Sequence, residues 1–344
     1  MVALSGGVDS AVSAALLLRA GYEVEAAFMK NWSKTEGLIK NDCPWLEDRR
    51  DALRVAAFLN IPLKTFDFEK EYSEKVMEYF FKEYSEGRTP NPDVMCNKEI
   101  KFKLLYNAAM DAGFDYLATG HYAQILDDKL VRSKDEFKDQ TYFIYNLQKE
   151  QLHHILFPIG KYKKSEVREL AKKFKLPNAE RRESMGLCFV GKVKLEDFLQ
   201  QNIKTKAGEI VDTSGKKVGT HNGVWNYTLG QRQGLKVGGD GPYFVVNKDI
   251  KKNELIVSKD QDDAQLMFST VEVSAINWID APTKYPFKGL ARFRHQQELQ
   301  NVEVFKSDSE TYTVKFKTAQ RAVTSGQSIV FYKSKVCLGG GVIQ

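Results

Sequence analysis

The hexapeptide Ser-Gly-Gly-Val-Asp-Ser at residues 5–10 constrains this chain more than any other segment. It follows a short apolar run at residues 2–4 and leads into an Ala- and Leu-rich helical pattern at residues 11–19. A strand, a glycine turn and a helix start in this order let backbone N–H groups converge on an anion, which the helix dipole also favours. Gly6 and Gly7 allow the left-handed backbone and the close approach that a side chain would block. The segment therefore predicts a phosphate-binding turn in an α/β fold.

The first half of the chain alternates between strand and helix patterns. Strand patterns occupy residues 24–28, 63–66 and 116–118, and helical patterns occupy residues 45–59, 72–84, 97–112 and 165–174. Strands that alternate with helices predict a doubly wound parallel sheet. Ligands bind at the carboxyl ends of such strands, so we expect the loops after residues 4, 28 and 118 to meet around one nucleotide. Asn97 is a good N-cap, and we expect the helix at residues 97–112 to begin there.

The pattern changes after about residue 200. Short alternating runs between turn residues replace the helical periodicity, at residues 208–211, 217–220, 243–247, 255–258, 268–275, 289–294, 302–305, 311–316 and 328–332. Such runs are typical of small β domains and barrels. A length of 344 residues exceeds one ordinary core. We therefore predict an α/β domain at residues 1–198, a small central β domain at 199–260 and a C-terminal β-barrel at 261–344.

Composition excludes several protein classes. No apolar run approaches the roughly 20 residues that span a bilayer, and 42% hydrophobic with 28% charged residues is the mixture of a globular protein. The first residues enter the strand and turn directly, so we expect no signal or transit peptide. The first strand is short, which leaves a start further upstream open. The net charge of +6 is compatible with a polyanionic partner.

The four cysteines, at positions 43, 96, 188 and 337, are widely spaced and form no Cys-x-x-Cys motif. This spacing excludes a disulfide scaffold and a zinc ribbon, and it makes a reducing compartment the default. We expect Cys43 and Cys337 to be small buried side chains.

Cys96 and Cys188 stand in polar settings instead. Cys96 precedes the expected helix start, where the helix dipole, Lys98 and Lys101 favour a thiolate. Asp93, three residues earlier, is placed to transfer a proton. Cys188 lies in a glycine-flanked loop that follows two arginines. One fixed and one mobile cysteine suit sulfur carriage, because a persulfide on one can be attacked by the other, which releases sulfur and leaves a disulfide.

The turn at residues 5–10 lacks the lysine of the ordinary phosphate loop, Gly-x-x-x-x-Gly-Lys-Ser/Thr. Other motifs stand with it in chain order: Phe-Met-Lys-Asn-Trp at 28–32, Gly-Arg-Thr-Pro-Asn-Pro-Asp at 87–93 with Cys-Asn-Lys at 96–98, Ala-Thr-Gly-His-Tyr at 118–122, Gly-Leu-Cys-Phe-Val-Gly at 186–191, Tyr-Thr-Leu-Gly-Gln-Arg at 227–232 and Cys-Leu-Gly-Gly-Gly at 337–341. The turn resembles the loop of the ATP pyrophosphatase (PP-loop) superfamily. With the other motifs, the whole chain is similar to the tRNA-specific 2-thiouridylases, the MnmA family of bacteria and its mitochondrial relatives.

This resemblance implies roles for individual residues. ATP would be bound by Ala3, Leu4, Ser5, Gly6, Gly7, Val8, Asp9, Ser10, Met29 and Gly120. Cys96 would be the nucleophile and Cys188 the persulfide carrier, the two would form a transient disulfide, and Asp93 would complete the catalytic set. Asn91, Pro92 and Asp93 would touch the target uracil. Contacts to tRNA would come from His121, Lys138, Asp139, Gln140, Arg292, Phe293 and Gln327.

The resemblance also implies a reaction and partners. O2 of the wobble uracil would attack the α-phosphorus of ATP, pyrophosphate would leave, and persulfide sulfur would displace AMP at position 2. Mg²⁺ would accompany ATP, because the leaving pyrophosphate needs charge neutralisation, and no protein ligands to a metal are expected. The implied partners are the tRNAs for Lys, Glu and Gln and a cysteine desulfurase or sulfur-relay protein, with no membrane partner. The implied compartment is the cytoplasm, although Met185 stands where bacterial relatives often carry threonine and thus keeps the mitochondrial matrix as an alternative.

Three other functions stay open. The first is an ATP-dependent C–N or amide ligase of the PP-loop superfamily that adenylates a small metabolite and needs no paired cysteines. The second is a non-catalytic tRNA-binding protein, against which the intact Ser5, Asp9 and Ser10 argue. The third is thiolation through an iron–sulfur cluster, which is not favoured because two placed cysteines are fewer than the usual three or four ligands.

Overall fold

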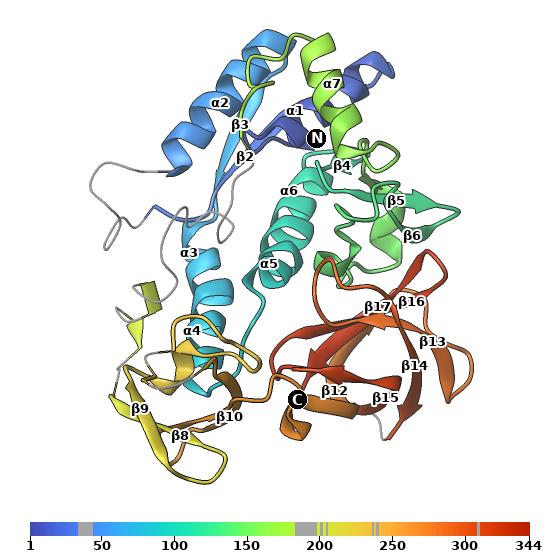
Figure 1. The fold of residues 1–344 in the computed structure, drawn as a ribbon. Coiled ribbons are helices and arrows are strands. Elements are labelled where there is room, and N and C mark those ends of the chain that lie inside the picture. Colours follow the sequence, from blue (N-terminus) through green and yellow to red (C-terminus); the bar gives the residue numbers. More distant parts are fainter. Residues whose placement is uncertain are drawn as a thin grey trace.

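The computed structural model describes residues 1–33, 44–182, 198–199, 202–203, 206–235, 237–238, 241–307 and 310–344. In the view of Figure 1, an α/β domain lies above two β domains, a smaller one in yellow and a barrel in orange to red. The predicted fold class is confirmed. The residues at which one domain ends and the next begins stay a prediction.

The N-terminal sheet has five parallel strands in the order β3-β2-β1-β4-β7. Their bounds are β1 Val2–Ala3, β2 Ala26–Lys30, β3 Leu63–Asp67, β4 Leu117–Ala118 and β7 Ile155–Leu156. The order reverses between β1 and β4, which is the position where an open α/β sheet binds its ligands. The turn at residues 5–10 follows β1, so the sheet presents this turn at its reversal point.

Helices cover both faces of this sheet. One face packs against α1 Val8–Arg19, α2 Pro44–Leu59 and α7 Lys164–Lys173. The other face packs against two rods, each built from consecutive helical pieces. The first rod contains α3 Glu69–Tyr72, η1 Ser73–Met77 and α4 Glu78–Ser85, and the second contains α5 Pro92–Met95, η2 Cys96–Leu105 and α6 Tyr106–Asp111. The two cores explain why β1 is apolar at every position: Val2 belongs to one core and Ala3 to the other.

The second rod begins earlier than the sequence pattern predicts. Its N-cap is Asn91, whose Oδ1 accepts the Val94 N–H at 3.2 Å, and Pro92 takes the first helical position. The predicted start at Asn97 is wrong, because the Asn97 amide instead donates to the Phe143 carbonyl at 3.1 Å and no helix end lies there. Cys96 therefore stands inside the rod and not just before it.

The central domain is a small four-stranded sheet in the order β10-β11-β8-β9. Its strands are β8 Gly208–Asp212, β9 Lys217–His221, β10 Phe244–Asp249 and β11 Glu254–Ser258. Alternate strand residues, among them Ile210, Val245 and Leu255, form its core.

The C-terminal domain is a closed antiparallel barrel, since β12 pairs with both β15 and β17. Its six strands are β12 Met267–Trp278, β13 Phe287–Arg292, β14 Gln300–Lys306, β15 Tyr312–Arg321, β16 Ser328–Lys333 and β17 Val336–Ile343. The short helices are η3 Thr141–Phe143, η4 Glu150–His154, η5 Val224–Asn226 and η6 Ala264–Leu266. No helix in the described part of the chain is long and apolar enough to cross a membrane.

A hairpin of the N-terminal domain extends the barrel's sheet. It consists of β5 Ala123–Leu126 and β6 Lys129–Arg132, and β6 pairs with β17 of the barrel. Asp127 and Asp128 both have positive φ angles, of 50° and 57°, as the tightest hairpin turns require. The two domains are thus joined by main-chain hydrogen bonds as well as by side chains.

Candidate active site

The turn at residues 5–10 is organised by its own hydrogen bonds. The Ser5 N–H donates to Ser10 Oγ at 3.2 Å, and Ser10 Oγ donates to the Gly7 carbonyl at 3.0 Å. Gly7 is the N-cap of α1 with extended backbone (φ −76°, ψ 159°) and supplies no capping side chain. The first N–H groups of α1 are therefore left for an external acceptor, and the helix dipole favours an anion there.

Gly6 is the fixed point of this turn. Its φ angle is +80°, and a Cβ atom at this position would collide with the carbonyl oxygen of Asp48. The Gly6 carbonyl accepts from the Asn178 amide at 2.7 Å and from Arg181 Nη1 at 3.1 Å. Arg181 also forms ion pairs with Asp48 and with Asp51. The turn thus has a defined shape before any ligand binds.

Asp9, in the first turn of α1, forms an ion pair across the site. Lys164 Nζ lies 2.7 and 2.8 Å from the two Asp9 carboxylate oxygens, and the Tyr122 hydroxyl donates to Oδ1 at 3.0 Å. Lys164 is the first residue of α7, so a helix far along the chain brings an ammonium group to the phosphate turn. No motif in the sequence marked Lys164 as part of this site. The available signals were the missing lysine in the turn and a Lys-Lys pair at a helix start.

The other expected ATP ligands lie around the same edge of the sheet. A Cβ atom on Gly120 would come within 2.8 Å of the Ser10 nitrogen, so the loop after β4 packs directly on the start of α1. Met29 is buried on β2, which pairs with β1. Ala3, Leu4 and Val8 are buried too, and would offer a ligand backbone groups only. Their contacts with ATP stay predictions.

Cys96 is 1% exposed on the second rod. It lies beyond the first turn after Asn91, so its expected position just before a helix start is wrong. Lys101 Nζ contacts Asn97 Oδ1 at 2.8 Å. Asp93 lies in the first turn of α5 and precedes Cys96 by three positions, which places both side chains on one side of the helix.

His121 connects the rod with the end of β4. Its Nδ1 lies 2.7 Å from Thr119 Oγ1 and its Nε2 lies 3.4 Å from Lys101 Nζ. Burial, and then the charge of Lys101, hold the pKa of His121 well below its usual value, so the ring is neutral near pH 7. Its ring also packs against Phe102, with centroids 5.6 Å apart. A buried neutral ring suits a structural role between the phosphate turn and Cys96.

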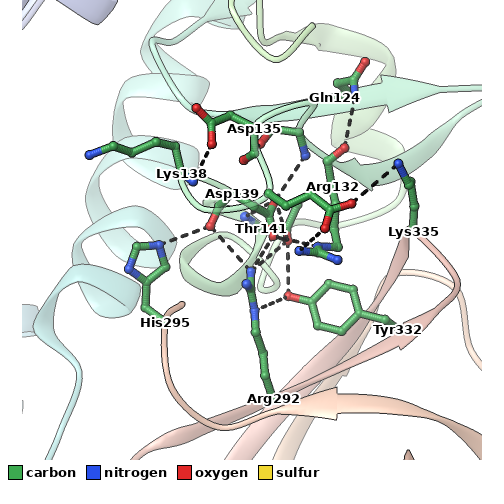
Figure 2. A network of polar contacts seen from close by, with 12 residues as sticks. Gln124, Arg132, Asp135, Lys138, Asp139, Thr141, Arg292, His295, Tyr332 and Lys335 are labelled. Atoms are coloured by element: carbon green, nitrogen blue, oxygen red, sulfur yellow. Dashed lines mark hydrogen bonds and ion pairs between the residues drawn. The ribbon is translucent and has the colours of Figure 1, made fainter. Parts of the chain in front are cut away.

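Two residues expected to contact tRNA are buried together between the N-terminal domain and the barrel (Figure 2). Arg292 and Asp139, which are 1% and 0% exposed, form an ion pair. Arg292 Nε also donates to the Tyr332 hydroxyl at 3.1 Å, and Thr141 Oγ1 donates to Asp139 Oδ2 at 2.9 Å. Arg132 Nε lies 3.3 Å from the same carboxylate oxygen. The burial of this pair argues against a direct contact of Arg292 and Asp139 with RNA, and that contact stays a prediction.

The remaining residues of the expected tRNA set are divided between surface and interior. Phe293 is buried in the barrel core, and its expected contact with tRNA stays a prediction. Lys138 and Gln140 are partly exposed, and Gln140 Oε1 accepts the Tyr122 N–H at 2.9 Å. Gln327 donates to the Thr89 carbonyl at 2.7 Å, next to the loop that leads to Asn91.

The cysteines differ in how the structure treats them. Cys337 is fully buried, and burial raises the pKa of its thiol to about 12, as expected for a structural side chain. Cys43 and the predicted persulfide carrier Cys188, and with it the predicted disulfide to Cys96, lie outside the described residues. Within the described residues, no three His, Cys, Asp or Glu side chains gather as metal ligands would.

Three sequence families match successive parts of the chain. The family described as "tRNA methyl transferase HUP domain" matches residues 1–192. The "tRNA methyl transferase PRC-barrel domain" matches residues 196–259, and the "Aminomethyltransferase beta-barrel domain" matches residues 268–343.

Full-length relatives carry one name. Proteins named "tRNA-specific 2-thiouridylase MnmA" from Oceanobacillus iheyensis, Streptococcus thermophilus (strain ATCC BAA-491) and Acinetobacter baumannii (strain ACICU) are 47%, 44% and 43% identical to this chain. Each alignment covers 100% of this chain, and it covers 94%, 94% and 96% of the respective relative. Among solved structures, an NMN synthetase from Francisella tularensis matches with a TM-score of 0.35 and 20% identity over 57% of this chain and 70% of that one, a level that carries no argument.

Proposed function

The chain belongs to the family of tRNA-specific 2-thiouridylases, and we propose that it uses ATP to convert the wobble uridine of tRNA to 2-thiouridine. The observation that carries this proposal is the end-to-end match with relatives of that name. All three matching families mention methyl or aminomethyl transfer in their descriptions, but each matches a single domain, whereas the relatives match over the whole chain.

ATP would bind with its phosphates on the turn at residues 5–10. The free N–H groups of α1 would face the phosphates, and Lys164 would add a positive charge that the turn itself lacks. Asp9 holds Lys164 in place until the ligand arrives. Mg²⁺ would be held by ATP phosphate oxygens and water, which suits an ion that keeps several waters, because Asp9, the carboxylate of the turn, is already paired with Lys164. Mg²⁺ would neutralise the charge of the leaving pyrophosphate.

The sulfur steps would use Cys96 and Cys188. Uracil O2 attacks the α-phosphorus and pyrophosphate leaves. The terminal sulfur of a Cys188 persulfide then attacks C2, and AMP leaves with the electron pair of the C2–O bond. The Cys96 thiolate attacks Cys188 Sγ, so the S–S electron pair passes to the sulfur on the base and a Cys96–Cys188 disulfide remains. A dithiol reductant restores both thiols. Asp93, next to Cys96 on the helix, would accept the thiol proton.

Recognition of tRNA would be divided between base and backbone. Asn91, Pro92 and Asp93, at the start of the rod, would contact the flipped uracil, since a base must leave its stack to reach a buried site. Lys138 and Gln140, the partly exposed members of the expected set, would contact the RNA directly. The substrates would be the tRNAs for Lys, Glu and Gln, the sulfur donor a cysteine desulfurase or relay protein, and the compartment the cytoplasm.

The proposal is tested with purified tRNA, ATP and a persulfide-charged desulfurase. Nucleoside mass spectrometry measures 2-thiouridine, and pyrophosphate release is followed separately. Cys188→Ser should yield no 2-thiouridine while pyrophosphate release continues, and Cys337→Ala should thiolate normally because its thiol is buried away from the chemistry. Normal thiolation by Cys188→Ser would exclude the carrier role.

The same assay separates the competing functions. A ligase would release pyrophosphate without tRNA, and its activity would survive the double substitution of Cys96 and Cys188 by serine. A non-catalytic binding protein would bind tRNA and release no pyrophosphate.

A further inference from the structure

A cavity of about 390 Å³ opens between the central domain and the barrel. The central domain contributes Thr228 and Gln231, and the barrel side contributes Arg294, Arg321 and Gln327. This volume is in the range of small-ligand pockets and large enough for one nucleotide unit. Among the described residues that line the cavity, the charged side chains are Arg294 and Arg321, and none is a carboxylate.

The two arginines are poorly compensated. Arg294 Nη2 donates to the Ala322 carbonyl, a neutral acceptor. Arg321 Nε donates to the Gln261 carbonyl at 2.7 Å, and the exposed Asp262 carboxylate lies 3.9 Å from the same nitrogen. Burial, and then the positive charge of Arg321, lower the pKa of Arg294. Two guanidinium groups that repel each other at a half-buried site favour an anion between them.

The cavity is built by two domains in one fixed arrangement. Gly230, in the central domain, has a φ angle of +78°, and a Cβ atom there would come within 2.9 Å of the Ala322 Cβ. The next residue, Gln231, lines the cavity and bonds back to its own loop, since its Oε1 accepts the Thr228 N–H at 3.0 Å. Close packing of this loop on the barrel thus shapes the cavity wall.

The cavity adjoins the loop that carries the expected uracil contacts. Gln327 lines the cavity and donates to the Thr89 carbonyl at 2.7 Å. The Thr89 N–H donates to the Ser325 carbonyl at 3.0 Å, and Lys248 Nζ bonds the Gly87 carbonyl from the central domain. Both β domains therefore contact the segment that leads into Asn91. Gln327 connects this segment to the cavity, because it lines the cavity and bonds Thr89.

We propose that this cavity binds a phosphodiester of the RNA chain close to the reacting uridine, with Arg294 and Arg321 as its ligands. The inference rests on the proposed function, because it takes tRNA as the substrate. An anchored phosphate beside the loop at residues 87–91 would fix the backbone while the base turns toward Cys96. Planar guanidinium groups suit phosphate because they donate paired hydrogen bonds to its oxygens.

The experiment measures dissociation constants for a substrate tRNA over a salt series, with Arg294→Gln, Arg321→Gln, Arg294→Lys and the control Arg54→Gln. Arg54 is 70% exposed on α2, on the far side of the molecule from the cavity. Each Gln variant should weaken tRNA binding about tenfold. It should also reduce by about one the magnitude of the salt slope, which is the slope of the logarithm of the binding constant against the logarithm of the salt concentration. Arg294→Lys should keep the slope, and Arg54→Gln should behave like the unchanged protein. Melting temperatures identify any variant that is not folded. If Arg294→Gln does not fold, Arg321→Gln still tests the proposal.

Unchanged tRNA affinity and salt slope in both Gln variants would overturn the proposal while the proposed function stands. Weakened binding of ATP or AMP with an unchanged tRNA slope would overturn it too, because the cavity would then belong to a free nucleotide. If the unchanged protein bound and thiolated no tRNA, the proposed function itself would fail, and this result is recognised before any variant is measured.

Discussion

Arg292 should act in this protein as a structural cation and not as an RNA ligand. The substitution Arg292→Met removes its ion pair with Asp139 and its hydrogen bond to Tyr332, but keeps most of the apolar volume. Removing one member of a buried pair costs about 3–5 kcal/mol, and the lower end of this range applies here because Arg132 stays 3.3 Å from Asp139 Oδ2. At about 1.4 kcal/mol per factor of ten, this lower end corresponds to a change in local opening of about a hundredfold.

Amide hydrogen exchange over residues 133–145 is the suitable assay, because the Ser133 and Thr141 N–H groups both bond the Asp139 carboxylate. A chain of several domains does not unfold in two states, so a local probe is preferable to a global transition. The control is Lys288→Met on the same strand, β13, where an exposed pair with Glu303 should contribute less than about 1 kcal/mol.

Protection of this segment within twofold of the unchanged protein, together with a tRNA salt slope lowered by about one, would refute the reasoning. Arg292 would then bind phosphate, as the sequence alone indicates, and its burial in the structure would not describe the state that binds RNA.

Three further outcomes follow from the site and its surroundings. Gly7→Val should weaken ATP binding at least about tenfold with little change in melting temperature, because the backbone angles of Gly7 suit any residue. Gly6→Ala should instead destabilise the fold by about 1–3 kcal/mol, because Gly6 has a positive φ angle. Calorimetry with ATP and thermal melting separate the two effects, and equal losses of melting temperature in both variants would contradict the distinction. Lys164→Met should raise the ATP dissociation constant about tenfold or more, since a charge-assisted hydrogen bond from Lys164 to a phosphate would contribute about 1.5–3 kcal/mol and Asp9 would lose its ammonium partner. Unchanged ATP affinity by calorimetry would show that Lys164 does not contact the phosphates. Burial lowers the pKa of Lys248 to about 8 from 10.5, so between these pH values the unfolded chain binds more protons than the folded chain, and stability should rise with pH. Urea midpoints at pH 8 and pH 10.5 should show this rise in the unchanged protein and a smaller rise in Lys248→Met. Equal rises in both proteins would show that Lys248 is not responsible.

Short sequence patterns correctly predicted those elements whose structure depends on neighbouring residues alone. The turn at residues 5–10 and the strands around it follow from glycine, an apolar run and a helix start, and the structure has them at those positions. The start of the second rod was misplaced at Asn97, although Asn91 followed by Pro92 is itself a local signal for an N-cap and a first helical position. Both residues are good caps in isolation, and only the contact between Asn97 and Phe143 decides between them.

Contacts between distant residues left no comparable trace in the sequence. Asp139 and Arg292 form an ion pair across 153 positions, and each stands beside polar or aromatic residues that suit a surface equally well. Lys164 reaches Asp9 across 155 positions, so its role at the phosphate turn follows only from the way α7 packs beside α1. The family resemblance identified which positions matter, but it could not give the burial that decides how Arg292 acts.

The pairing of the β5–β6 hairpin with β17 has a consequence for biosynthesis. During translation at about 5–20 residues per second, β6 leaves the ribosome tens of seconds before β17, so its outer edge stays without a partner for that time. An open strand edge invites pairing with other chains. The barrel itself closes only when β17 pairs with both β12 and β16. Ribosome-bound chains that end before β17 should therefore engage chaperones, and emergence of β17 should be the event that makes the barrel resistant to protease.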